Sequence, residues 1–310
     1  MTLKNLAGYY WLIPVYILVQ SCQQIAARTH SQPVSGPVTA SSVSATPLPN
    51  AYAHNDYWQK RPLFDALDNG YTYIEVDIFK VGDEFIVAHL IPFFRQRKTL
   101  ENMYLRPLYE RISRNNGYVY PGYKRPITLM IDIKMNGEST YRSLKPLFKR
   151  YQRILTSYTN GVLEERQVTI VLSGSKPFHQ LQKENIRYAF IDEDLRKIKT
   201  SVYGKELCPI SSCKYTSLIN WDGENEIPEP EKQKLVSYVL TAHAQGKKVR
   251  LWATPEKENL WNTLLEYGVD MINTDRLASL KTFLVNRSQA EKMSIVSINH
   301  SSPTVLTDRK

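Results

Sequence analysis

Residues 72–79 read TYIEVDIF, a β-rich run in which Glu75 and Asp77 stand two positions apart. Successive side chains of a strand point to opposite faces, so residues two apart share one face. The run ITLMIDIK at residues 127–134 repeats this arrangement with another pair of charged residues. Each stretch therefore predicts a strand that presents two charged side chains on one side.

Further β-rich runs alternate with helical patterns along the chain. The predicted strands are residues 51–54, 72–79, 127–134, 168–173, 188–192, 215–220, 248–253 and 269–273, with a hairpin-like return at 84–89. The predicted helices are residues 62–69, 100–112, 140–158, 231–245, 257–267 and 277–285. Parallel neighbours need crossover connections, and eight strand–helix units can close into a barrel without a free edge. We therefore expect an α/β fold of the (β/α)8 TIM-barrel type. An open doubly wound sheet is the alternative, but no glycine-rich phosphate loop follows the first strand.

The N-terminus predicts export and a lipid anchor. Lys4 precedes an uncharged stretch at residues 6–19, which is too short to span a membrane but suits the apolar core of a signal peptide. The stretch ends at Val19-Gln20-Ser21-Cys22, which resembles the lipobox of bacterial lipoproteins, where the cysteine is acylated. An ordinary cleaved signal peptide is the alternative.

These features predict four regions. They are a signal peptide at 1–21, a lipidated Cys22 with a Ser/Thr/Pro-rich tether at 22–50, a barrel at 51–286 and a polar tail at 287–310. The protein is therefore expected to be an exported lipoprotein, anchored to a membrane and facing the periplasm or the cell surface. Outside the cytoplasm, Cys208 and Cys213 are expected to form a disulfide.

The charge of the chain favours anionic partners of small size. The formal net charge is +10, and the 40 lysines and arginines are spread out without a run of five. Zinc-finger spacing and an aromatic RNA-binding signature are also absent from the sequence. We therefore expect a phosphate-bearing small molecule or a phospholipid headgroup as the partner, and no nucleic acid.

Polar residues stand at almost every predicted strand end, where barrels of this class carry their chemistry. They are His54, Asn55, Glu75, Asp77, His89, Asp132, Lys134, Ser173, Asp192, Trp221, Asp222, Arg250, Trp252, Asn273 and Asp275. Carboxylates packed together are costly unless a cation neutralises them, and oxygen ligands favour Mg²⁺ or Ca²⁺ over zinc. The alternative is an internal salt-bridge network without a catalytic role.

Several of these residues lie in recognisable motifs. The motifs are Ala53-His54-Asn55-Asp56, Tyr73-Ile74-Glu75-Val76-Asp77, Val87-Ala88-His89, Ile131-Asp132-Ile133-Lys134, Arg250-Leu251-Trp252-Ala253-Thr254-Pro255 and Gly268-Val269-Asp270-Met271-Ile272-Asn273-Thr274-Asp275. Together they span roughly residues 51–285 and resemble the glycerophosphodiester phosphodiesterase and phosphatidylinositol-specific phospholipase C superfamily. The likeness is greatest to the branch with His-Asn-Asp-Tyr at the first strand, which includes the fungal altered-inheritance-of-mitochondria protein.

The resemblance implies a phospholipase C-like phosphodiesterase barrel with a metal and two proton-transfer groups. His54 and His89 would act as base and acid on the attacking and leaving oxygens, because the pKa of histidine lies near neutrality. Glu75, Asp77 and Asp132 would hold the divalent metal. A buried core role is the alternative for His89.

Further residues are expected around the substrate. Asn55 stands where glycerophosphodiesterases commonly carry arginine; there the chain is similar to phosphoinositide phospholipases, whose asparagine binds Ca²⁺. Lys134 would bind a phosphate oxygen. Arg250 and Trp252 would line the headgroup pocket, or form a structural pair. Asp275 is grouped with them, either orienting a catalytic group or capping the last helix.

The expected function is therefore metal-dependent cleavage of phosphodiesters derived from phospholipids, with glycerol- or inositol-type headgroups. Two alternatives remain open at this stage. One is a sphingomyelinase D-like phospholipase, because the pair of Asp132 and Lys134 resembles that of sphingomyelinase D-like barrels. The other is a non-catalytic lipoprotein that binds headgroups.

Overall fold

The computed structural model describes residues 45–90 and 98–300, and of residues 294–300 it describes the backbone alone. The expected signal peptide, Cys22 and all but the end of the tether lie outside these residues. Among the helices that are described, none is both long and apolar enough to cross a membrane.

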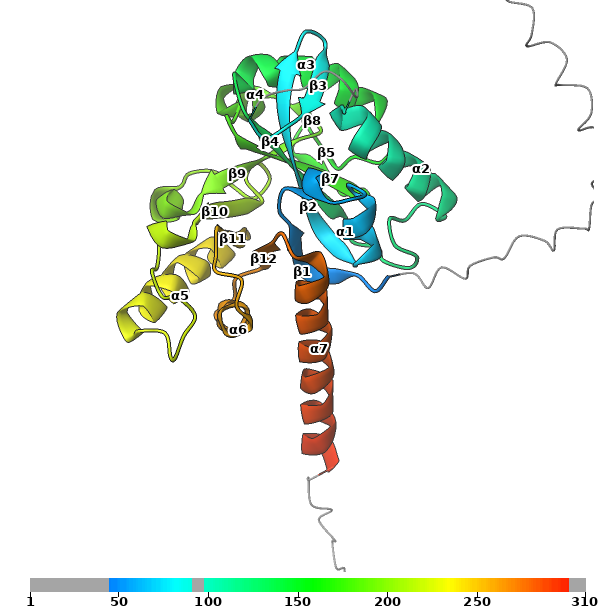
Figure 1. Ribbon diagram of the computed structural model, residues 1–310. Coiled ribbons are helices and arrows are strands. Elements are labelled where there is room, and N and C mark those ends of the chain that lie inside the picture. Colours follow the sequence, from blue (N-terminus) through cyan, green and yellow to red (C-terminus); the bar gives the residue numbers. More distant parts are fainter. Residues whose placement is uncertain (1–44, 91–97, 301–310) are drawn as a thin grey trace, which may run out of the picture. The chain divides into compact units, whose positions relative to one another are not determined.

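Eight parallel strands close into a barrel (Figure 1). In order around the ring they are β1 (Leu48–Ala53), β2 (Tyr71–Val81), β4 (Ile127–Ile133), β7 (Val168–Gly174), β9 (Phe190–Asp194), β10 (Ile210–Lys214), β11 (Lys248–Trp252) and β12 (Met271–Thr274). Closure is complete because β1 pairs in parallel with both β2 and β12. A further strand, β3 (Glu84–Val87), extends β2 as an antiparallel neighbour. The predicted TIM-barrel class is confirmed.

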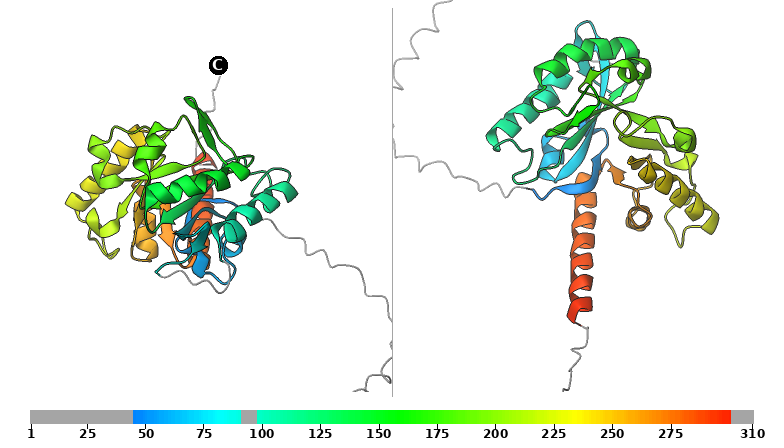
Figure 2. Two further views of the ribbon diagram at one scale, coloured as in Figure 1. Left: turned by 90° about the horizontal axis from the view of Figure 1, so that it is seen from above. Right: turned by 180° about the vertical axis from the view of Figure 1, so that it is seen from behind.

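Helices connect the strands and lie outside the sheet (Figure 2). They are α1 (Phe64–Asp68), α2 (Arg106–Arg114), α3 (Gly137–Arg150), α4 (Phe178–Lys183), α5 (Glu229–Ala244), α6 (Glu258–Glu266) and α7 (Leu277–His300). Short helical turns add η1 (Asp56–Trp58), η3 (Glu101–Leu105), η4 (Leu195–Thr200) and η5 (Tyr215–Ser217). A small separate sheet contains β5 (Ser157–Thr159), β6 (Val162–Glu164) and β8 (Ile186–Arg187).

The strand alternation divides the buried side chains into two sets. One set packs between the strands and the helices. The other fills the inside of the barrel and consists of Tyr52, Tyr73, Met130, Val171, Phe190, Ile210 and Met271. Because Tyr73 points inward, the alternation of β2 also directs Glu75 and Asp77 inward, nearer the C-terminal end of the strand. The packed interior thus forms a floor beneath those carboxylates.

The sixth strand is the clearest departure from the sequence prediction. It was expected at residues 215–220 but lies at β10, whose sequence ISSCK has small serine and cysteine side chains at its centre and is largely buried. Tyr215 instead begins a short helical turn, and its hydroxyl donates to the Trp221 carbonyl at 2.5 Å. Trp221 is packed in the outer core, so the predicted placement of Trp221 and Asp222 at a strand end is wrong.

Several predicted element ends also differ. The fifth strand begins at Phe190 and not at residue 188, and the helix expected to run to residue 158 ends at Arg150. The last helix was expected to end at residue 285 but continues to His300. The polar residues after 285 are therefore helical in the described part, because polarity alone does not break a helix.

The two cysteines of the barrel are buried free thiols, so the expected disulfide is wrong. Cys213 lies in the extended strand β10, and Cys208 lies two residues before that strand begins. The three steps of extended strand from Ile210 to Cys213 alone cover about 10 Å, at ~3.3 Å per residue. A disulfide needs Cα atoms within about 7 Å. Burial raises the pKa of each thiol to about 12, which keeps both sulfurs protonated.

Candidate active site

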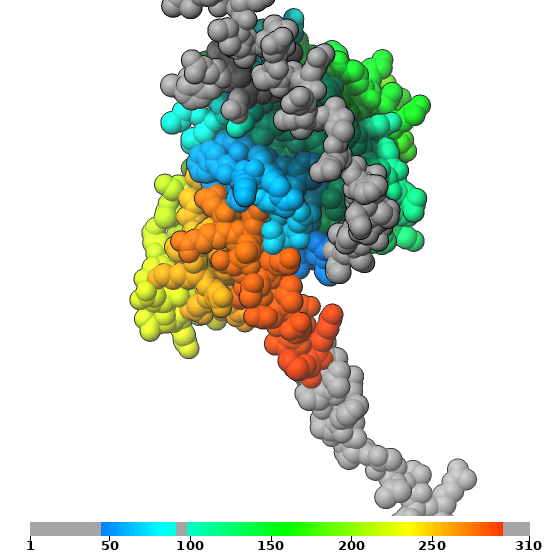
Figure 3. Space-filling model, turned by 45° about the vertical axis from the view of Figure 1, so that its right-hand side comes forward, coloured from blue at the N-terminus to red at the C-terminus, as the bar shows by residue number. Residues whose placement is uncertain are grey.

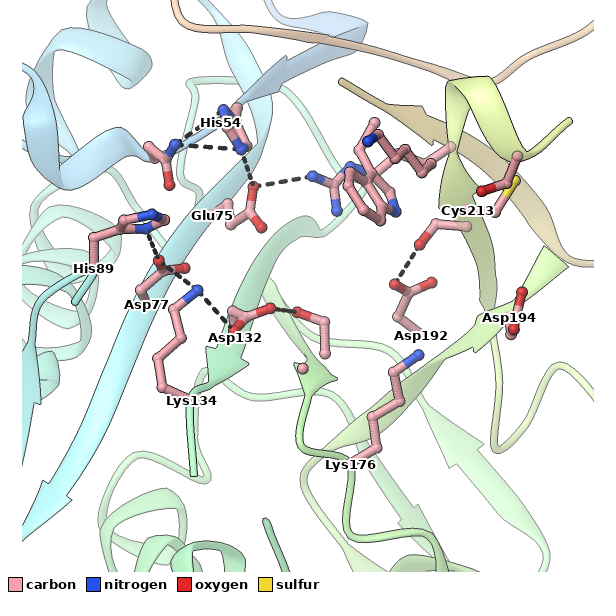
Figure 4. Close-up of a pocket in the computed structure, with 18 of the residues that line it drawn as sticks. His54, Glu75, Asp77, His89, Asp132, Lys134, Lys176, Asp192, Asp194 and Cys213 are labelled. Atoms are coloured by element: carbon pink, nitrogen blue, oxygen red, sulfur yellow. Dashed lines mark hydrogen bonds and ion pairs between the residues drawn. The ribbon is translucent and has the colours of Figure 1, made fainter. Parts of the chain in front are cut away.

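Strand register brings the acidic side chains of the barrel together. Asp77 on β2 is paired with Asp132 on β4, and Asp132 is paired with Ser173 on β7. The three side chains therefore stand side by side at the C-terminal ends of neighbouring strands (Figure 4). The Ser173 hydroxyl donates to Asp132 Oδ2 at 3.1 Å, which orients that carboxylate.

Three carboxylates form a cluster that could hold a metal ion. Glu75, Asp77 and Asp132 each offer one oxygen, and these oxygens all lie within 4.8 Å of one another. Burial raises the pKa of Glu75, although the nearby Arg250 opposes this effect. The donor set consists of carboxylate oxygens, which fits Mg²⁺ or Ca²⁺ better than a thiolate-preferring metal. The predicted metal ligands are thus brought together.

Lys134 lies against this cluster. Its Nζ is 2.6 Å from Asp77 Oδ2 and 3.0 Å from Asp132 Oδ1. Burial alone would lower the pKa of Lys134, but its contacts with the two carboxylates raise it overall, so the ammonium stays charged. Lys134 is thus a charged side chain beside the cluster, and its binding of a phosphate oxygen stays a prediction.

His54 lies at the end of β1 and is oriented by Asp275, which follows β12. His54 Nδ1 and Asp275 Oδ1 are 2.8 Å apart. A carboxylate can only accept, so Nδ1 carries the proton and donates it. This leaves Nε2 facing Glu75, whose Oε2 lies 4.0 Å away. Burial lowers the pKa of His54, but the hydrogen bond to Asp275 and the charge of Glu75 raise it overall.

His89 is held in the same manner on the other side of the cluster (Figure 4). Its Nδ1 lies 3.0 Å from Asp77 Oδ2 and donates to it. The side chain is 43% exposed, so the alternative of a buried core histidine is wrong. The Trp58 ring packs edge-on against the imidazole, with centroids 5.3 Å apart. Nε2 of His89 is therefore the ring nitrogen that remains for proton transfer.

Asn55 and Tyr57 connect the two histidines. Asn55 has a left-handed backbone (φ 46°), and its Nδ2 lies 3.1 Å from His54 Nδ1 and 3.3 Å from His54 Nε2. Because Nδ1 carries the proton, only Nε2 can accept from this amide. The Tyr57 hydroxyl lies 2.8 Å from Asn55 Oδ1 and 2.7 Å from Asp77 Oδ2. Asn55 therefore lies beside the carboxylate cluster, in the place where it was expected. Tyr57 was missed, although it is the tyrosine of the His-Asn-Asp-Tyr sequence and could have been found there.

Arg250 lies deep in the site and is bound on several sides. Its Nη2 donates to Glu75 Oε2 at 3.0 Å and to Asn273 Oδ1 at 2.7 Å. The guanidinium also lies 3.9 Å from the centre of the Tyr52 ring. Such contacts fit the inward-facing structural role that was the alternative for Arg250. Trp252, by contrast, is 39% exposed at the same strand end and has surface to offer a ligand.

The predicted site residues share one cavity of about 550 Å³, with the exception of Asp275. Asp275 contacts His54, so of its two expected roles the structure supports the orientation of this histidine. The far side of the cavity was not predicted as part of the site. It is lined by Lys176, Asp192, Asp194, Arg196, Ser212, Cys213, Lys214 and Ser217. Of these, Asp192 had been noted at a strand end.

Comparisons with known proteins agree with this architecture. Residues 42–192 match the model of the AIM6-like phosphodiesterase domain, and residues 248–278 match the glycerophosphoryl diester phosphodiesterase family. The altered inheritance of mitochondria protein 6 homolog of Arthroderma benhamiae is 26% identical over 303 residues, covering 88% of this chain and 95% of that protein. The altered inheritance of mitochondria protein 6 of Eremothecium gossypii is 27% identical over 276 residues, covering 76% and 69%.

A solved structure is also similar. It is a glycerophosphodiester phosphodiesterase from Parabacteroides distasonis, 16% identical, with a TM-score of 0.47, covering 77% of this chain and 98% of that one. The two family models cover the segments that supply both histidines, the carboxylate cluster and Arg250. The chain is thus a member of the glycerophosphodiester phosphodiesterase and phospholipase C-like superfamily, related to the altered inheritance of mitochondria protein 6.

Proposed function

We propose that the protein is a metal-dependent phosphodiesterase that cleaves glycerol- or inositol-type phosphodiesters derived from phospholipids. One observation carries the proposal. His54 and His89 flank the cluster of Glu75, Asp77 and Asp132, and a carboxylate holds each imidazole through Nδ1. Two imidazoles with Nε2 available are what is needed to move one proton to and one proton from a phosphodiester.

The residues divide the work as follows. His54 Nε2 takes the proton of the attacking water or substrate hydroxyl, and His89 Nε2 gives a proton to the leaving oxygen. Lys134 binds a non-bridging phosphate oxygen. A divalent metal bound by the carboxylate cluster would neutralise the phosphate charge. A hydroxyl on the substrate next to the phosphate would allow a cyclic phosphate to form before water completes the hydrolysis.

Two other functions would use the same cavity. A sphingomyelinase D-like phospholipase would release choline, and a headgroup-binding lipoprotein would release no product. The second does not require two oriented histidines, since binding alone involves no proton transfer. Product analysis separates the first from the proposed function.

The first test is hydrolysis of bis(p-nitrophenyl) phosphate by the purified protein, with EDTA and then with Mg²⁺ or Ca²⁺ restored. We expect metal-dependent turnover that falls by at least about 100-fold in His54→Ala and in His89→Ala. His179→Ala is the matched control, because His179 is an exposed histidine of α4 outside the cavity. Full turnover in EDTA, or in both active-site variants, would refute the proposal.

A further inference from the structure

Lys134 contacts two of the three candidate metal ligands. Its Nζ lies 2.6 Å from Asp77 Oδ2 and 3.0 Å from Asp132 Oδ1, and both contacts are drawn in Figure 4. No other ion pair or hydrogen bond of this ammonium is found among the described residues. A divalent ion bound by the cluster would therefore share two carboxylates with the ammonium of Lys134.

The charges around the cluster limit how strongly it can hold a cation. The three carboxylates carry three negative charges when they are ionised. Lys134 and Arg250 each place one positive charge in direct contact with them, so that one negative charge remains in excess. The affinity of an oxygen site for Mg²⁺ or Ca²⁺ depends on the number of charged ligands, and like charges repel strongly in a partly buried site. Lys134 thus opposes the binding of a metal ion.

Of these two cations, Lys134 is the one that can move. The Arg250 guanidinium also donates to Asn273 Oδ1 at 2.7 Å and lies 3.9 Å from the centre of the Tyr52 ring, and the residue is only 3% exposed. These contacts fix it in place. The side chain of Lys134 is 23% exposed, lines the cavity and carries its ammonium on a flexible four-carbon stem. Lys134 can therefore turn from the carboxylates towards an anion in the cavity.

A phosphodiester in the cavity changes this balance of charge. Its negatively charged oxygens offer the ammonium of Lys134 a new acceptor, and they also attract a metal ion held by the carboxylates. The anion thereby offsets the repulsion between the ammonium and the metal ion. Such coupling is reciprocal, so a phosphate that strengthens metal binding is itself bound more tightly by the metal-loaded protein, to the same extent.

We propose that Lys134 couples the binding of the metal ion to the binding of the phosphate group. Its ammonium weakens metal binding until a phosphate anion enters the cavity, and the metal ion and the anion then bind cooperatively. This inference rests on the proposed function, because it assumes that a metal ion and a phosphodiester meet at the carboxylate cluster. It adds that the site holds its metal ion tightly only while the substrate is present.

The test is a calorimetric titration of Mg²⁺, and separately of Ca²⁺, into the full-length protein. All titrations use the His54→Ala background, in which the proposed proton transfer is blocked, with and without saturating dimethyl phosphate, a phosphodiester that carries one negative charge. Without dimethyl phosphate, adding Lys134→Met is expected to tighten metal binding by at least about tenfold. With dimethyl phosphate, this gain should fall below about threefold, because the anion then offsets the repulsion.

Lys176→Met is the matched control for the loss of one positive charge. Lys176 lines the same cavity, but no contact between it and the three carboxylates is found among the described residues. Its removal should change the metal affinity by less than about threefold, because a more distant and exposed charge is screened. Far-UV circular dichroism and thermal melting check that each variant is folded. Lys134→Gln repeats the measurement if Lys134→Met does not fold.

Four outcomes would overturn the inference: unchanged or weaker metal binding by the neutral variants of Lys134, an equal gain with and without dimethyl phosphate, an equal gain in Lys176→Met, or no binding of either ion. Turnover of bis(p-nitrophenyl) phosphate by the unmutated protein, and its loss in EDTA, report on the proposed function alone. A protein that shows this turnover while Lys134→Met gains no metal affinity keeps its proposed function and loses the inference.

Discussion

His54 and His89 come from different strands, yet each donates its Nδ1 proton to a carboxylate. Both histidines and the acidic cluster could be predicted as site residues from the sequence. For the carboxylates of β2 the reason is that residues two positions apart lie on one face of a strand. The partner of His54 could be read only in part. Asp275 is 221 positions away, and its alternative role as a helix cap was equally consistent with its place in the chain.

The first prediction concerns Asp275→Asn. Asp275 raises the pKa of His54 by accepting its Nδ1 proton. An amide loses the negative charge and can present its NH₂ group to Nδ1, so the pKa of His54 should fall and the wrong tautomer should gain population. If His54 is the base, the rise of kcat/KM with pH should move to lower pH, while its plateau drops by about tenfold or more.

A pH profile of kcat/KM between pH 5 and 9 measures both effects in one experiment. The falling limb of the same profile serves as the internal reference, because Asp275→Asn leaves the contact between His89 and Asp77 unchanged. An unchanged rising limb with an unchanged plateau would show that Asp275 has no role in orienting His54.

The second prediction concerns Asp56, a buried carboxylate next to the site. Its Oδ2 accepts from the Leu63 backbone N–H and the Tyr104 hydroxyl, while Oδ1 has no partner among the described residues. Burial raises the pKa of Asp56 to about 6, and the two hydrogen bonds oppose this effect. The folded state therefore holds a proton that the unfolded chain loses near its ordinary pKa of about 4.

The direction in which stability changes with pH follows from this difference in protonation. The raised pKa means that stability declines as the pH rises from about 4 to about 6, by at most about 3 kcal/mol. Asp56→Asn removes the titration, so its stability relative to wild type should increase over that window. Urea unfolding at pH 4, 5, 6 and 7 measures the difference, with Asp83→Asn in an exposed turn as the control. A difference that is constant with pH would contradict the prediction.

At the scale of elements, the end of β7 bears directly on the acidic cluster. Gly174 has φ +68°, a left-handed conformation that side chains rarely adopt. A Cβ at this position would lie 2.6 Å from Asp132 Oδ1 and 2.6 Å from the Ile133 carbonyl. The glycine thus leaves room for a carboxylate that is a candidate metal ligand.

Gly174→Ala is accordingly the third prediction. We expect it to displace Asp132, weaken activation by Mg²⁺ by about tenfold and lower stability by about 1 kcal/mol or more. Gly161→Ala is matched to it, because Gly161 also has positive φ but nothing lies within 4 Å of its Cβ position. The control should share the loss of stability and keep its metal activation. Equal metal activation in both variants would remove Gly174 from the site.

The barrel strands also show which parts of the fold could be predicted from the sequence and which could not. Seven of the eight barrel strands overlap their predicted ranges, because each has an apolar β-rich run. The exception is β10, because it contains Ser211 and Ser212 and lacks the run of large apolar residues by which the other strands were predicted. Ser212 holds Asp192 through a side-chain contact, which periodicity does not reveal. The sequence analysis therefore missed β10 and the far wall of the cavity for the same reason, which is that β10 has small polar residues where large apolar ones were expected.

At the scale of the whole molecule, two features bear on the cellular location of the protein, namely the net charge of +10 and Cys22. We propose, as the fourth prediction, that it is an exported lipoprotein held by acylation of Cys22. The full chain, expressed in a bacterium that processes lipoproteins, should sediment with membranes, and Cys22→Ala should move most of it to the soluble exported fraction. Cys208→Ala is the control, because Cys208 is a buried thiol of the barrel. Equal partitioning of both variants would reject the anchor.

The pairing of β1 with β12 has a consequence for the synthesis and folding of the chain. These strands are parallel neighbours, and the blue and orange segments that begin and end the barrel touch at the surface (Figure 3). Both histidines and all three carboxylates are synthesised by residue 132, but Asp275 arrives near the end. A chain that is released early or cut before β12 would carry the reactive groups without the support that directs His54. We therefore expect a chain that lacks β12 to turn over phosphodiesters more slowly than the finished chain, since the carboxylate that orients His54 is missing.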